Sequence, residues 1–243
     1  MHPPDVPTAH DGPGELRPCA DTRPADWLGE RLTGTRWATV ASMCTQDYEA
    51  YARILHPTWH DPDGSGDDDE LRPVTWGRIA EANGYRLHPE IRFEEIVRVG
   101  GETLISQPGL WEYGPSNAGP PSEICAPLTD ILARHTRTPR QCWFALWDGY
   151  GVMRDLIPQG APRAILPGRD KLLFQGPLAA LRDDEPPLRV QFDHWWPQDR
   201  AWCLGADVDL WSSYLGGSEE CIAEIVACPE LEAFRIGPDQ KIF

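Results

Sequence analysis

Hydrophobic and polar residues alternate over short stretches of this chain, which predicts β-strands because successive side chains of a strand point to opposite faces. The clearest alternation runs from Ala201 to Leu210, where Trp202, Leu204 and Ala206 would share one face. The predicted strands cover residues 36–42, 48–55, 103–106, 141–147, 201–210 and 231–236, together with a hairpin at 164–175.

Hydrophobic residues recur at helical spacing in several other stretches, each bounded by residues that begin or end helices. Ser122 and Ser218 are typical N-cap residues before such a stretch, and Asn83 and Gly84 are typical of a helix end. The predicted helices cover residues 24–34, 74–82, 91–97, 122–135, 177–182 and 219–227.

The order of these elements lacks a regular alternation of strand, helix and strand, so a parallel sheet is not expected. We therefore predict the α+β fold class, with an antiparallel or mixed sheet and helices packed on one face. The chain of 243 residues is long enough for a large core, and we predict a single domain at residues 24–243. Residues 1–23 are rich in Pro, Gly, Asp and His without periodicity, which predicts a disordered tail.

The net charge of −16 narrows the class of partners. A surface of this sign repels phosphate backbones, so we expect no nucleic-acid partner and favour a cationic protein partner. No apolar stretch is long enough for a membrane span, and no secretory signal is visible, so we expect no membrane partner. The seven cysteines include no C-x-x-C pair and are typical of reduced, buried residues. These features predict a cytoplasmic protein, and no motif indicates a cofactor.

The stretch from His194 to Trp211 holds four of the eleven tryptophans and supplies the candidate site. On an extended strand, Asp207 and Asp209 would face the same side about 7 Å apart, a spacing that suits metal binding or shared acid and base roles. His194 or Asp199 is a candidate to complete such a site. The alternative is that the two aspartates only mark the polar end of a half-buried strand.

Trp195 and Trp196 are consecutive, so they would point to opposite sides of an extended strand. Tryptophan is enriched at interfaces because it buries a large flat area and keeps one hydrogen-bond donor. We predict that one or both of these residues are partly exposed and contribute to ligand or partner binding. The other tryptophans are predicted to pack in the core.

Residues 61–70 form an acidic loop that partly matches the calcium-binding loop of an EF-hand. Asp61 and Asp63 fit the first and third positions, but Arg72 stands where a bidentate glutamate is required. Pro62 also fits that loop poorly, and no helix is predicted before it. We therefore interpret the segment as a flexible acidic insertion.

Five segments resemble those of a family of uncharacterised actinobacterial proteins: residues 142–151, 176–178, 195–203, 214–218 and 229–233. The resemblance covers roughly residues 24 to 236. No activity is known for that family, so the resemblance implies no site residues, and the acidic loop is a departure from its pattern.

Together, the charge, the tryptophan excess and the lack of a nucleophile or cofactor motif favour a non-catalytic cytoplasmic binding protein. Its most concrete form is an acidic protein that binds and neutralises a cationic partner, as immunity proteins do. The alternative is a metal-assisted hydrolase that uses the strand face of Asp207 and Asp209, with His194 or Asp199.

Overall fold

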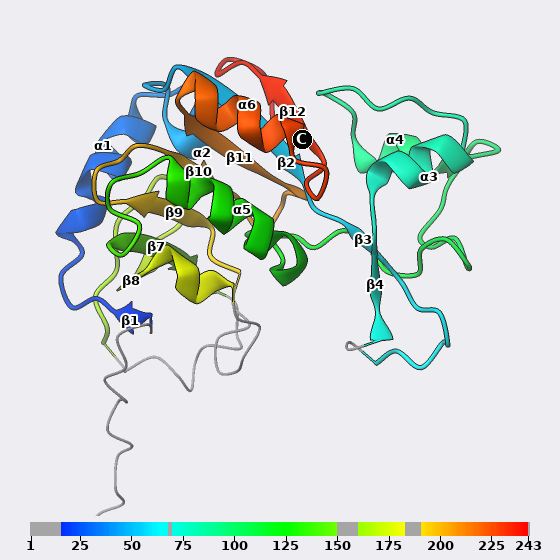
Figure 1. Cartoon of the computed structure of the whole chain (residues 1–243), viewed down its shortest axis with the longest axis horizontal. Coiled ribbons are helices and arrows are strands. Elements are labelled where there is room, and N and C mark those ends of the chain that lie inside the picture. Colours follow the sequence, from blue (N-terminus) through cyan, green and yellow to red (C-terminus); the bar gives the residue numbers. More distant parts are fainter. Residues whose placement is uncertain (1–15, 68–69, 150–159, 183–190, 243) are drawn as a thin grey trace, which may run out of the picture.

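An eight-stranded antiparallel sheet organises the computed structural model, which describes residues 16–67, 70–149, 160–182 and 191–242 (Figure 1). The strands lie in the order β1-β8-β7-β9-β10-β11-β2-β12. Their bounds are β1 Arg17–Pro18, β2 Ala50–Leu55, β7 Cys142–Trp147, β8 Lys171–Gly176, β9 His194–Pro197, β10 Cys203–Gly205, β11 Ser212–Gly217 and β12 Ala233–Ile236.

Both faces of this sheet are hydrophobic. In β7, Cys142, Phe144 and Leu146 point into one core cluster, whereas Trp143 and Ala145 contact the other. The alternation follows from the twofold period of a strand, and here it carries apolar residues on both sides. The central strands are therefore buried on both faces.

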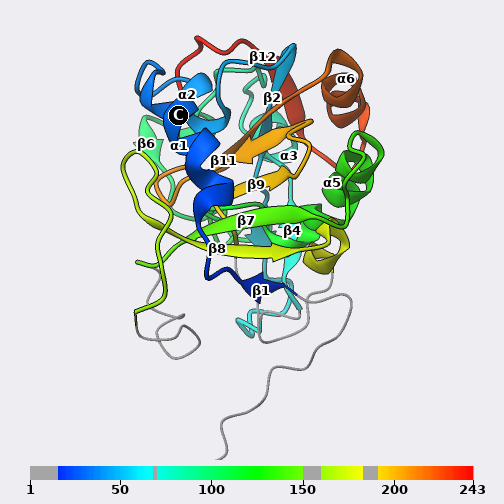
Figure 2. The same ribbon diagram turned by 90° about the vertical axis from the view of Figure 1, so that its left-hand side faces the viewer.

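Helices cover both faces (Figure 2). One face carries α5 (Ser122–Arg134), the 3₁₀ helix η4 (Leu178–Leu181) and α6 (Glu219–Ala227), and the other carries η1 (Arg23–Ala25), α1 (Asp26–Thr33) and α2 (Ala41–Cys44). The predicted α+β class and antiparallel sheet are confirmed. The expected restriction of helices to one face is corrected, because the second face is also apolar and is buried by α1 and α2.

Between β2 and α5 the chain forms a lobe, residues 58–113, beside the sheet (Figure 1). Its own hydrophobic cluster is built around Trp76, Phe93 and Trp111 and includes Leu55 of the sheet. The elements of the lobe are β3 Thr58–His60, β4 Arg72–Val74, α3 Trp76–Ala82, α4 Phe93–Ile96, β5 Arg98–Val99 and β6 Glu102–Thr103.

A partly buried carboxylate connects the lobe to the sheet. The side chain of Glu232, just before β12, accepts hydrogen bonds from the backbone N–H groups of Trp76 and Gly77, each at 2.7 Å. It thereby satisfies two of the free N–H groups at the start of α3. Trp76 also donates its indole N–H to the carbonyl oxygen of His56, which follows β2.

Of the two predicted serine caps, the structure shows the one at Ser218 and not the one at Ser122. The helix α6 covers 219–227 as predicted, and the Ser218 hydroxyl accepts a hydrogen bond from the Cys221 N–H at 3.2 Å. The helix α5 begins at Ser122 itself, with Pro121 as the N-cap and no side-chain capping bond.

In the described residues, no helix combines the length and apolar character that a membrane crossing requires.

Two expectations at the N-terminal end are wrong. The strand predicted at 36–42 is absent: Thr39 forms only an isolated bridge, Ala38 has a φ of 59°, and α2 starts at residue 41. Seven alternating residues do not distinguish a strand from a turn that leads into a helix. The disordered tail predicted at 1–23 is wrong for its last part, because Arg17 and Pro18 pair with β8. The part of that prediction at residues 1–15 lies outside the described residues.

Candidate functional site

Trp195 and Trp196 are core residues, which corrects the prediction that they are partly exposed. Each is only 1% exposed, because β9 lies between β7 and β10 and both of its faces are covered. The Trp195 indole donates to the carbonyl oxygen of Phe192 at 3.0 Å, and Trp196 meets Trp27 edge-on. Neither side chain is available to a partner of the folded protein.

Asp207 and Asp209 converge, but on a cation of the chain itself. The strand β10 ends at Gly205, so the two aspartates lie in a turn and not on the predicted strand face. Arg169 donates to Asp207 at 3.1 and 3.3 Å and to Asp209 at 2.7 Å. Its guanidinium also lies over the ring of Trp147, 4.5 Å from the centroid. The two carboxylates therefore hold an arginine between β10 and the segment before β8.

We expect Arg169→Met to lower the free energy of unfolding by about 1–3 kcal/mol, because two carboxylates lose their shared partner and an aromatic ring loses a cation. Urea titration measures this change. Arg72→Met is the matched control, since Arg72 is an exposed arginine that pairs with the exposed Glu70. Equal losses in the two variants would contradict a structural role for the Arg169 cluster.

A buried ion pair lies on the neighbouring strands. Lys171 donates to Asp193 at 2.8 Å, and the two side chains are 3% and 0% exposed. The same Asp193 oxygen accepts the backbone N–H of Trp147 at 2.6 Å. A charge pair at this depth is stable only because each partner neutralises the other.

His194 follows Asp193 directly and is also buried, with neither ring nitrogen in a hydrogen bond of normal geometry. Burial and, to a smaller extent, the charge of Lys171 lower its pKa to about 3, although the backbone of Met43 partly opposes the shift. The imidazole is therefore neutral at ordinary pH. In the described residues, no group of three or more His, Cys, Asp or Glu side chains is arranged to hold a metal ion.

Asp199 anchors a turn and does not join the two aspartates on Arg169. Its carboxylate accepts hydrogen bonds from the Thr136 hydroxyl at 2.7 Å and from the Arg137 N–H at 2.8 Å. Burial opposes its ionisation, but these bonds prevail and hold the pKa of the carboxyl below its usual value. The residue fixes the connection between α5 and β7.

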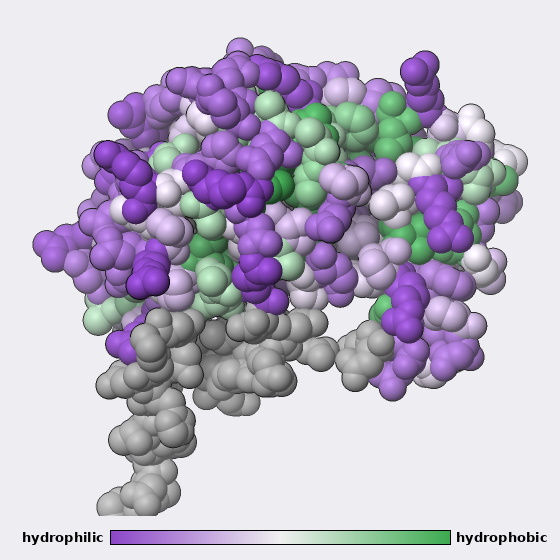
Figure 3. Space-filling model, in the orientation of Figure 1, coloured by the Kyte–Doolittle hydropathy of each residue, from purple (hydrophilic) through white to green (hydrophobic). Residues whose placement is uncertain are grey.

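The acidic loop is organised by its own side chains in a way that differs from an EF-hand. The Asp61 carboxylate accepts the N–H groups of Gly64 and Gly66 at 2.9 and 3.0 Å, and Asp63 accepts that of Ser65 at 3.0 Å. Each of these carboxylates accepts backbone N–H groups of the loop, and no three acidic, His or Cys side chains of the described residues are arranged there to hold a metal ion. Figure 3 shows mainly hydrophilic side chains on the lower part of the lobe, around β3 and β4.

Glu112 anchors the base of this loop and was not singled out from the sequence. Its carboxylate accepts hydrogen bonds from the His60 ring and from the N–H groups of Asp61 and Gly109, each at 2.8 Å. The neighbouring Tyr113 is 45% exposed, and its hydroxyl lies close to Gly66. Only the tertiary structure brings residues 61–67 and 109–113 together, so no sequence motif marks this surface.

A serine and a histidine also meet at the junction of lobe and sheet. The His56 Nε2 atom lies 2.8 Å from the Ser213 hydroxyl, and its Nδ1 atom lies 2.8 Å from the carbonyl oxygen of Ser116. Such a contact occurs in nucleophilic catalysis, but both side chains are 0% exposed. The pair therefore joins β2 to β11 inside the protein and is closed to a substrate.

Comparison with known proteins does not test the predicted resemblance to a family of uncharacterised actinobacterial proteins. No family model, curated protein or solved structure matches this chain.

Proposed function

We propose that this protein is a non-catalytic interaction protein whose acidic lobe binds a cationic protein partner. The observation that carries the proposal is the make-up of residues 58–113. This lobe has twelve acidic residues and five arginines, a net charge of −7 in 56 residues, against −9 in the other 187. Negative charge is therefore concentrated on one projecting part of the molecule.

Exposed hydrophobic side chains gather on the same lobe. Seven large hydrophobic side chains are exposed in the described part of the chain, and four of them belong to the lobe: Tyr85, Val99, Ile105 and Tyr113. Ile105 is 92% exposed. A binding surface needs apolar contacts as well as charge, because charge mainly raises the association rate and selects the partner.

The carboxylates of the sheet region are more often neutralised by neighbours. Asp207 and Asp209 share Arg169, and other acidic side chains outside the lobe have arginine partners: Asp47 with Arg31, Glu219 with Arg235, and Glu224 with Arg134. In the loop, by contrast, Glu70 contacts Arg72, while Asp63 lies exposed among backbone donors. Among the described residues, arginines therefore neutralise fewer of the carboxylates in the lobe than in the sheet region.

Preorganisation of residues 61–67 also favours binding at this surface. Hydrogen bonds within residues 61–67 and to Glu112 hold the backbone of these residues before a partner arrives, which reduces the entropy lost on binding. Tyr113 beside the loop supplies an aromatic ring for a lysine or arginine of the partner. In its most specific form, the proposal makes this a protein that covers and neutralises a basic site, as immunity proteins do.

The metal-assisted hydrolase has less support. Its candidate carboxylates, Asp207 and Asp209, bind Arg169, so a metal would have to displace a guanidinium held by three hydrogen bonds. His194 is buried beside Lys171 and not in that cluster.

We expect Asp63→Asn/Asp67→Asn/Glu70→Gln to weaken binding of an octa-arginine peptide about tenfold, because the three removed charges lie in the loop. Isothermal titration at low salt measures the change, and added salt should weaken wild-type binding. Asparagine at position 63 keeps an oxygen that accepts the Ser65 N–H.

The matched control removes three exposed carboxylates from the sheet region, Glu30→Gln/Glu220→Gln/Glu230→Gln, and should change binding less than twofold. An equal loss in both triple variants would show that the peptide senses net charge alone and would contradict an interface on the lobe. Tyr113→Ala in the wild-type background tests the aromatic contribution separately.

A further inference from the structure

Arg140 lies in the turn before β7, toward the β1 edge of the sheet and away from β12. Its side chain borders two hollows in the surface. It contributes to the lining of both, and their volumes are about 550 and 690 Å³. Within the described residues, its guanidinium has no hydrogen-bond or ion-pair partner. An arginine without a protein partner, set beside a hollow, is available to an anion.

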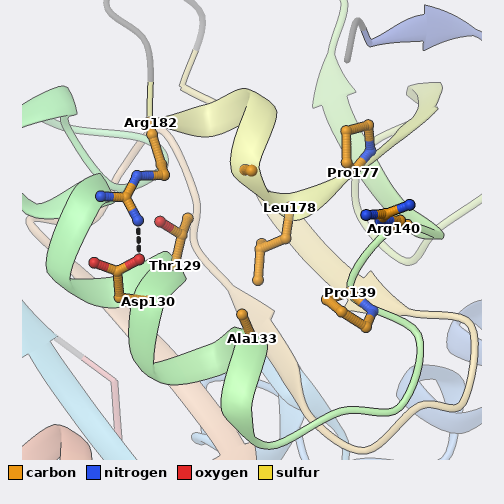
Figure 4. A pocket seen from close by; sticks show the side chains of 9 residues that line it. Thr129, Asp130, Ala133, Pro139, Arg140, Pro177, Leu178 and Arg182 are labelled. Carbon is orange, nitrogen blue, oxygen red and sulfur yellow. Dashed lines mark hydrogen bonds and ion pairs between the residues drawn. The ribbon is translucent and has the colours of Figure 1, made fainter. Parts of the chain in front are cut away.

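The smaller hollow lies between α5, η4 and the segment before β7 (Figure 4). Ala133, Pro139, Pro177 and Leu178 give it an apolar lining, and Leu178 itself is only 1% exposed. Figure 4 shows Leu178 pointing between η4 and α5, with Arg140 at the same end as Pro177. The hollow thus offers apolar contacts next to a cation that no described residue pairs.

The charges around this hollow favour a negative ligand. At its other end, Arg182 pairs with Asp130, so that arginine is already neutralised (Figure 4). Arg140 leaves the lining with a net positive charge, although the chain as a whole carries −16. The volume lies in the range of small-molecule sites, and a planar guanidinium matches the two oxygens of a carboxylate or phosphate.

We propose that this hollow binds a small organic anion, with its carboxylate or phosphate on Arg140 and its apolar body against Leu178 and Pro139. The larger hollow, beside Trp143 and Gln175, also borders Arg140. The site uses no residue of the acidic lobe, so the outcome of its test does not depend on the proposed partner surface.

Phenylacetate and phenyl phosphate are suitable probes because each joins one aromatic ring to one anionic group. Ligand-observed NMR with the full chain should detect at least one of them, with a Kd on the order of 1 mM for so few atoms. The neutral analogue phenylacetamide should bind at least about tenfold more weakly than phenylacetate, because it lacks the charge. Binding of phenylacetate alone would indicate a carboxylate site, and binding of phenyl phosphate alone would indicate a phosphate site.

Arg140→Gln should raise the Kd of the bound probe at least about tenfold. Arg137→Gln is the matched control, since Arg137 is an exposed arginine of the same loop that does not line the hollow; it should change the Kd less than twofold. Ala179→Phe fills the hollow from an exposed position and should also abolish binding. The proposal is overturned if neither probe binds, if the two arginine variants lose equally, or if Ala179→Phe binds like wild type.

Discussion

Replacing Lys171 with methionine is expected to lower the free energy of unfolding by about 3–5 kcal/mol, the cost of leaving a buried charge without its counter-charge. Lys171 and Asp193 are 3% and 0% exposed and lie 2.8 Å apart, so water cannot replace the lost ammonium. Asp193 keeps the hydrogen bond from the Trp147 N–H, but a backbone dipole does not compensate for a full cation. Urea unfolding at neutral pH measures the loss.

The double variant Lys171→Met/Asp193→Asn separates the charge from the packing. It removes both charges and retains the side-chain shapes, so it should be more stable than Lys171→Met alone. The amide oxygen of the introduced asparagine can still accept the hydrogen bond from the Trp147 N–H. If the double variant loses the sum of the two single losses, the pair does not interact energetically and the interpretation of the ion pair is wrong.

Acidification from about pH 7 to about pH 5 is expected to remove on the order of 2–4 kcal/mol of stability through two buried histidines. Burial lowers the pKa of His56 to about 4 and that of His194 to about 3, against 6.5 for an unperturbed histidine. Both rings are neutral in the folded protein, so unfolding takes up protons below pH 6.5. Their stabilisation is complete above that pH and is lost as the pH falls toward the folded-state values.

Substitution tests this assignment. His56→Gln removes one titrating group, so the loss of stability between the two pH values should shrink by about half. His88→Gln is the control, because His88 is exposed and lies outside the two buried sites; a reduction as large as that in His56→Gln would contradict the assignment. A wild-type protein that is equally stable at both pH values would refute the neutral, buried state of the two rings.

The elements that local chemistry specifies could be predicted from the sequence. The helix α6 begins after a serine whose hydroxyl caps it, and the alternating residues of β7 match the observed strand to within one residue. Such signals act over a few residues, so they are readable without the fold. The α+β class followed from the order of these elements.

The candidate site could not be predicted in the same way. Arg169, which binds both Asp207 and Asp209, lies about forty residues before them, and no local pattern links the three. The burial of Trp195 and Trp196 depends on β7 and β10 flanking β9, a neighbourhood that the sequence of β9 does not contain. The alternation from 201 to 210 failed for a related reason, because β10 stops at Gly205 where the chain turns to meet Arg169.

The position of β2 has a consequence for synthesis of the chain. It lies between β11 and β12, whose residues follow it by more than 150 positions, and all six of its residues are buried. When the protein emerges from the ribosome, β2 and the lobe precede both of these neighbours. The sheet is complete only after the last strand has left the exit tunnel. Until then both edges of β2 lack their neighbouring strands and must be kept from pairing with other chains.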